Sequence, residues 1–146
     1  MIQILKIKLF TLHVLLPLLA GIIVYLFFRT TPIIAFSFLK ESEIIFKYES
    51  SSRDFQFFIG SFPDFCWLYA LLSMQSEFIW GEIKNIPLPI LFFLYATPIF
   101  TEILQHYNFI KGTSDNADVI AYLLAIIIHY IFHKNKTYEP KTQVSS

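Results

Sequence analysis

Long apolar runs alternate with short polar stretches along this chain. The first run covers residues 9–28, and a helix of that length, rising about 1.5 Å per residue, spans a hydrocarbon core of about 30 Å. Three later segments have a similar length and character. The pattern therefore predicts an all-α fold, a transmembrane bundle of four helices at about residues 9–28, 63–80, 88–105 and 115–133.

The second predicted helix carries the most polar residues. Asp64 and Glu77 bracket an uncharged stretch that is too short to cross a bilayer by itself. A crossing helix must therefore begin near Pro63 and include both acidic residues. It would end near Trp80, whose ring would lie in the membrane interface as an anchor.

Two segments fall outside the predicted helices. The connector between the first two helices, residues 30–61, is long for a compact protein and interleaves charged residues with aromatic ones. We expect a solvated loop that dips into the membrane interface, and a short strand pair is the alternative that the alternating aromatics allow. Residues 134–146 are polar and without periodicity, so we expect a disordered tail after a single transmembrane domain at residues 1–133.

The third and fourth predicted helices have recognisable ends. Pro87 and Pro89 stand where the third helix opens, at positions whose N–H groups have no partner within a helix. Ser114 or Asp115 is expected to cap the fourth helix. Asp118 would then lie in its first turn, where the helix dipole favours negative charge.

The amino-acid composition limits the kinds of molecule that the chain is expected to bind. Hydrophobic residues make up 55% of it and charged residues 15%, and the formal net charge is zero. Because the chain has no basic field, we expect no nucleic-acid partner, and the composition indicates the lipid bilayer instead. Cys66 is the single cysteine, which excludes an intrachain disulfide and a cluster of cysteine metal ligands.

An even number of crossings places both termini on one side of the membrane. The alternation then gathers Asp64, Glu102 and Asp118 on the opposite side, whatever the absolute orientation. Lysines and arginines are slightly more numerous on the side of the termini. This bias predicts cytoplasmic termini and an acidic cluster that faces outward.

The polar group that begins at Glu102 is the most informative in the sequence. Gln105 and His106 lie three and four positions further on, so all three residues share one helical face. If this face turns toward Asp118, two carboxylates with an imidazole between them could hold a proton, a cation or a polar headgroup. The alternative is that these residues lie in the headgroup zone and face water. Helix capping explains Asp118 and does not explain Glu102.

We take the polar residues around this group, together with a nearby tryptophan, as the candidate binding site. They are Glu102, Gln105, Asp118, Asp115, Asp64, His106 and Trp67. The sequence holds no phosphate-binding loop, dinucleotide fingerprint, nucleophile elbow or zinc-protease motif. No catalytic residue is therefore assigned, and a role other than catalysis is favoured.

A histidine pair near the end of the fourth predicted helix has the spacing of two metal ligands. His129 and His133 lie four positions apart, and the topology offers Glu77 or Glu82 as a third ligand. We expect instead an interhelical hydrogen bond and a cation at the helix end, with no metal or cofactor. His13 is expected to be a hydrogen-bonded polar residue inside the bundle.

Three short motifs resemble those of the VanZ-like family of small membrane proteins. They are Phe62-Pro63-Asp64-Phe65-x-Trp67, Glu102-x-x-Gln105 and Gly112-Thr113-x-Asp115-x-x-Asp118-Val119-x-Ala121-Tyr122. The likeness covers about residues 9–133. It implies a compact helical bundle in a bacterial inner membrane and an envelope-related role, since the founding member is associated with resistance to the glycopeptide teicoplanin. An arginine common near the acidic motif is absent here.

Three functions are compatible with these patterns. The first is that the acidic cluster binds a lipid headgroup or a cell-envelope precursor. The second is a proton- or cation-coupled carrier subunit, which would have to form a homo-oligomer because four spans are few for a carrier. The third is an accessory protein without catalytic activity that docks a partner through its Phe-rich connector.

Overall fold

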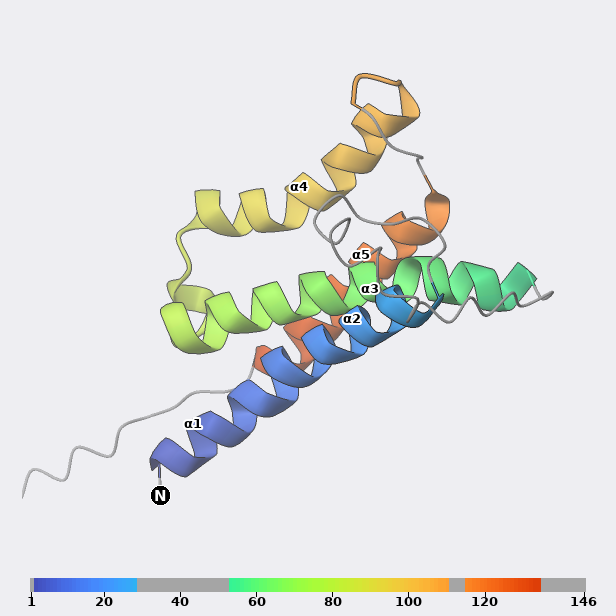
Figure 1. The fold of residues 1–146 in the computed structure, drawn as a ribbon. Helices are drawn as coiled ribbons and strands as arrows, with labels where there is room; N and C mark the ends of the chain where they lie inside the picture. The colour runs from blue at the N-terminus through green and yellow to red at the C-terminus, as the bar shows by residue number, and fades with distance from the viewer. Residues whose placement is uncertain (1, 29–52, 111–114, 135–146) are drawn as a thin grey trace, which may run out of the picture.

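The computed structural model describes residues 2–28, 53–110 and 115–134, and within these ranges all regular secondary structure is helical (Figure 1). This confirms the prediction of an all-α fold. A π-helical turn interrupts the first long helix, and another ends the second. The elements are α1 (Ile2–Phe10), η1 (Thr11–Leu15, π), α2 (Leu16–Phe28), α3 (Arg53–Met74), η3 (Gln75–Ile79, π), η4 (Ile83–Asn85, 3-10), α4 (Leu88–His106) and α5 (Asn116–His133).

Three of the helices are long and apolar enough to cross a membrane. They are the helix at Lys6–Phe28, the helix at Leu88–His106 and the helix at Asn116–His133. Large apolar side chains are exposed along all three, as expected where lipid takes the place of water. The α3 helix is not among these three.

The second long helix begins at Arg53, so the prediction of a start near residue 63 was wrong. Pro63 is buried inside α3, where it removes one backbone hydrogen bond without ending the helix. Aromatic rings stacked one turn apart support the helix on both sides of the proline; the stacked pairs are Phe58–Phe62, Phe62–Phe65 and Phe65–Tyr69. The last part of the predicted connector is therefore helical. Its remainder lies outside the described residues, as does the predicted tail beyond residue 134.

The other predicted boundaries agree more closely with the structure. The first helix starts at Ile2, earlier than residue 9, because no helix-breaking residue separates the N-terminal lysines from the apolar run. Pro87 is the N-cap of α4, as its position predicted. Asp115 caps α5, because its Oδ1 accepts a hydrogen bond from the backbone N–H of Ala117 at 2.9 Å.

The α3 helix lies between the first long helix and α5 (Figure 1). The first helix is antiparallel to α3, because Phe10 contacts Phe78 at one end while Phe28 contacts Phe55 at the other. The α5 helix runs parallel to α3, so successive helices alternate in direction (Figure 1). The buried core between α3 and α5 consists of Leu68, Tyr69, Leu72 and Ala125.

The α4 helix is less tightly packed than the others. Only 6% of the apolar segment of α4 that could cross a membrane is buried. The helix bends midway along its length (Figure 1). Pro98 lies within the helix, and a proline there removes a hydrogen bond from the helical ladder and allows a kink. The C-terminal half of α4 leads into the turn that joins it to α5. Asn108 in that turn has a φ of 58°, a left-handed conformation that asparagine tolerates at helix ends.

Close packing of α2 against α3 depends on Gly21. A Cβ atom at this position would lie 3.1 Å from the Cβ of Cys66 and 3.3 Å from the indole of Trp67. A Gly21→Leu variant should therefore lower stability by about 1–3 kcal/mol, through overpacking. The measurement is the midpoint of thermal unfolding in detergent.

Gly60 on α3 provides the matched control. A Cβ atom there would meet nothing within 4 Å, so Gly60→Ala should be neutral or stabilising by up to about 1 kcal/mol through helix propensity. Equal destabilisation by both variants would contradict the close approach at Gly21.

Candidate functional site

Three acidic residues from three helices lie near the Tyr122 side chain. Asp64 comes from α3, Glu102 from α4 and Asp118 from the first turn of α5. The Tyr122 hydroxyl donates a hydrogen bond to the Asp64 carboxylate and is within electrostatic range of the other two carboxylates. The structure thus brings together the three acids that the alternation of helices placed on one side.

Glu102 is the buried member of this acidic cluster, with 6% of its surface exposed. Its Oε2 accepts a hydrogen bond from the backbone N–H of Asp115 at 3.3 Å. Glu102 therefore links the end of α4 to the residue that caps α5. It also interacts with the carboxylates of Asp115 and Asp118, which carry like charge when ionised. A proton, a cation or a hydrogen-bond donor bound here would offset that repulsion.

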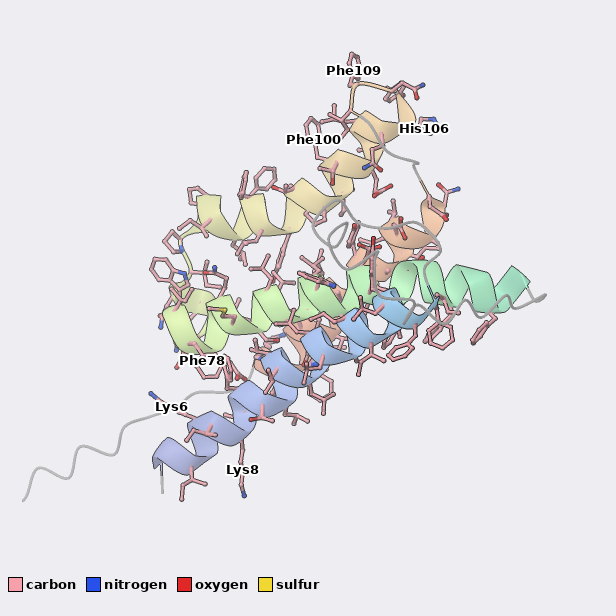
Figure 2. All side chains as sticks on the ribbon, viewed as in Figure 1. Lys6, Lys8, Phe78, Phe100, His106 and Phe109 are labelled. Atoms are coloured by element: carbon pink, nitrogen blue, oxygen red, sulfur yellow. The ribbon has the colours of Figure 1, made fainter. Side chains whose placement is uncertain are left out.

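Of the remaining predicted site residues, Trp67 lines a cavity together with Asp64 and Tyr122. Gln105 is half-buried near the end of α4. His106 is exposed at the tip of the helix, as labelled in Figure 2, and its ring contacts Tyr107 edge-on with ring centroids 5.4 Å apart. The structure therefore does not place an imidazole between the carboxylates. Half of the Trp67 surface is exposed, and its indole lies beside Gly21.

An apolar cavity of about 470 Å³ extends from the acidic cluster between the helices. Its volume lies in the range of ligand pockets in proteins. Asp64 and Tyr122 line one end of it, and Leu71, Met74 and Phe93 line the walls away from that end. The cavity lies between α3 and the half of α4 that precedes the bend, which contributes Phe93, Leu94, Thr97 and Pro98. The cavity therefore combines an apolar channel with a polar end.

The opposite end of the bundle holds a second polar cluster. His129 is fully buried on α5, and its Nε2 is 2.9 Å from the Ser76 hydroxyl on the second long helix. This confirms the predicted interhelical hydrogen bond. His133 lies one turn further on, with its Nε2 2.9 Å from the Glu77 carboxylate. Of the two acids proposed by topology, Glu77 lies here, whereas Glu82 pairs with a nearby lysine.

Sequence reasoning did not connect His13 with this second cluster. His13 is buried, as expected, and its Nδ1 lies 2.6 Å from the Tyr69 hydroxyl on α3. Its ring also contacts the His133 ring, with centroids 5.0 Å apart. The antiparallel pairing of the first two long helices was the available signal, because it places the middle of one helix beside the end of the other.

Comparison with protein-family models, curated proteins and solved structures finds no match for this chain. The functional argument is therefore carried by the residues and their geometry. Asp64 of the acidic cluster also lines the apolar cavity, so this end of the bundle combines carboxylates with an enclosed space. The histidine cluster at the other end consists of contacts of His129 with Ser76 and of His133 with Glu77.

The hydrogen bond between Glu102 and Asp115 gives a prediction about stability. Glu102→Gln keeps a side-chain oxygen that can accept from the Asp115 N–H, so its midpoint of unfolding should stay close to that of the original protein. Glu102→Leu removes the acceptor and should cost about 1 kcal/mol, measured by thermal unfolding in detergent. An equal loss in both variants would show that the negative charge, rather than the hydrogen bond, stabilises the turn.

Proposed function

We propose that this chain is an integral membrane protein that binds an amphiphile, either a membrane lipid or a lipid-linked cell-envelope precursor. The headgroup would lie at the acidic cluster and the hydrocarbon chain in the adjoining cavity. The observation that carries the proposal is the cavity itself, whose apolar walls end at Asp64 and Tyr122. An apolar channel with a few convergent polar groups is what an amphiphile requires.

The proposal treats α3 as a fourth membrane-spanning helix beside the three apolar ones. The hydroxyl-bearing residues Ser61 and Ser73 on α3, and Ser76 on the η3 turn that follows it, are buried. Apolar side chains such as Phe55 and Phe58 are exposed instead. Polar groups turned inward and apolar groups turned outward are typical of a helix within a membrane bundle. With four spans, cytoplasmic termini place the acidic cluster on the outward side of a bacterial inner membrane.

The carboxylates of the acidic cluster indicate which kind of lipid headgroup would bind there. Carboxylates accept hydrogen bonds and attract positive charge, so a headgroup with an ammonium group or several hydroxyl donors fits best. A purely anionic headgroup would be repelled by Asp64, Glu102 and Asp118. The resemblance to the VanZ-like family supports the same envelope-facing role, and through it a link to glycopeptide resistance.

A carrier subunit is the second candidate function. Pro98 lies one turn before Glu102, and the bend in α4 leaves this buried carboxylate beside a loosely packed segment. Proton or cation coupling at Glu102 would use the same residues, with a homo-oligomer supplying the remaining helices. The third candidate, docking through the Phe-rich connector, concerns residues that lie mostly outside the described part of the chain.

Lipid selectivity tests the proposed binding site. In nanodiscs with equal amounts of phosphatidylethanolamine and phosphatidylcholine, the purified protein should retain the former at least about threefold better. The reason is that an ammonium group donates hydrogen bonds to carboxylates whereas a trimethylammonium group cannot. The Asp64→Asn and Glu102→Gln double variant should lose this preference. Native mass spectrometry of the extracted protein measures the lipid retained.

A second pair of variants addresses the hydrocarbon channel. Leu71→Trp should fill part of the cavity and lower the total lipid retained, whereas Leu19→Trp, at an equally exposed position that does not line the cavity, should not. Unchanged lipid preference in the double variant, together with unchanged retention in Leu71→Trp, would rule out this site.

Membrane topology provides an independent prediction. In a Cys66→Ala background, a cysteine introduced at Asn116 should react with an impermeant thiol reagent applied from outside the cell. A cysteine introduced at Asn85, at the other end of the helices, should react only after the membrane is opened. Both positions are exposed, so accessibility to the reagent depends on the side of the membrane. Labelling of both residues from the same side would contradict a membrane-spanning α4.

A further inference from the structure

Side chains from three helices converge at the end of the bundle that lies opposite the acidic cluster. His13 on the first long helix, Glu77 on the second and His133 on α5 each offer a ligand atom, and these atoms lie within 4.8 Å of one another. The group is separate from the proposed lipid site. Glu77 follows Asp64 by thirteen positions along α3 and its π-helical end, a rise of roughly 20 Å.

The ring of His133 is oriented by its own helix. Its Nδ1 lies 2.9 Å from the backbone oxygen of His129 and must donate a proton to make that hydrogen bond. In the neutral ring, Nε2 then carries a lone pair. This Nε2 lies 2.9 Å from the Glu77 Oε1, yet the contact lacks hydrogen-bond geometry. Two acceptors held this close repel each other unless a positive charge lies between them.

Burial strengthens the repulsion between these two acceptors, because little water is present to screen it. The His133 side chain is 2% exposed and that of Glu77 is 11% exposed, so little water reaches either group. His13 is also buried, and its Nδ1 contacts the Tyr69 hydroxyl at 2.6 Å. In both rings one nitrogen makes a hydrogen bond, and a hydrogen bond of this kind orients histidines that bind metals.

The backbone supplies a second, independent observation. The described part of the chain contains two π-helical segments, and each carries a member of this group: Thr11–Leu15 holds His13, and Gln75–Ile79 holds Glu77. A π-helical turn rotates the following side chains relative to a regular helix. Such turns occur frequently at functional sites. Both departures from regular helix in the long helices thus occur where this cluster forms.

We propose that His13, Glu77 and His133 bind a divalent transition-metal ion, with Zn²⁺ as the best fit. Two imidazole nitrogens and one carboxylate oxygen are a ligand set that suits zinc, and a bound water would complete the coordination. With metal–ligand bonds of about 2.0–2.1 Å, tetrahedral ligand atoms lie about 3.4 Å apart. The spacing of the three groups therefore needs only small side-chain rotations to reach that geometry. The ion would join three helices at the end of the bundle near the termini.

Metal titration of the full-length protein in detergent tests this proposal. After treatment with a chelator, the protein should bind one Zn²⁺ per chain, and its midpoint of thermal unfolding should rise with zinc concentration. Co²⁺ should give the visible absorption of a site with nitrogen and oxygen ligands. Glu77→Gln and His133→Gln should each weaken Zn²⁺ binding by at least about tenfold, because each removes a ligand.

Two further comparisons separate a metal site from a structural ion pair. Tyr69→Phe keeps all three ligands but removes the hydrogen bond that orients His13, so it should weaken zinc binding by about tenfold. The exposed His106→Gln and the lysine-paired Glu82→Gln should leave zinc binding unchanged. Lipid preference at the acidic cluster should not change in any of these variants.

The proposal is overturned if the chelated protein shows neither a zinc-dependent rise in unfolding temperature nor Co²⁺ absorption. It is also overturned if zinc binds equally well to Glu77→Gln, His133→Gln and the two control variants, since the ion would then lie elsewhere. A variant that fails to fold does not remove the test, because the titration of the original protein and of Tyr69→Phe remains informative.

Discussion

Polar side chains on α3 and its π-helical end η3 make hydrogen bonds to the neighbouring helices. A buried donor or acceptor costs free energy unless it has a partner in its own helix or on another one. The hydroxyl of Ser76 reaches His129 on α5, and the hydroxyl of Tyr69 reaches His13 on the first helix. These bonds fix the rotation and the vertical register of the three helices, and the positions of both polar clusters follow from that register.

The α4 helix has fewer such links, and this difference explains the cavity. Its described polar link to α5 is the hydrogen bond between Glu102 and the Asp115 backbone, at the connecting turn. The half of α4 that precedes Pro98 lies across the apolar cavity from α3. A tightly packed three-helix unit with one loosely attached helix can admit a hydrocarbon chain without disturbing its core. The same unit holds the histidine cluster rigidly.

The sequence predicted the ends of the helices better than it predicted the contacts between helices. Pro87 and Asp115 mark their helices through backbone chemistry that does not depend on neighbours. The start of α3 was wrong because it was placed by the length that a membrane-crossing helix needs. The aromatic stacking that continues the helix on both sides of Pro63 depends on side-chain contacts that this length does not predict. The place of His13 was missed for a related reason. A periodicity of 3.6 residues cannot be extended across a π-helical turn, so the direction of its side chain could not be read from the pattern.

The free energy needed to bury a polar group differs between a serine hydroxyl and a carboxylate, and this difference helps to separate packing residues from functional ones. Ser73 is small, and a hydroxyl in a close helix contact is common in membrane bundles. Carboxylates such as Asp64, Glu77 and Glu102 are different, because apolar residues of similar size at such positions are often neutral or stabilising. Their presence in clusters at opposite ends of one helix unit therefore favours bound ligands over stability as their role. The two clusters differ in chemistry, since carboxylates with a phenol suit a donor-rich headgroup and imidazoles with a carboxylate suit a metal ion.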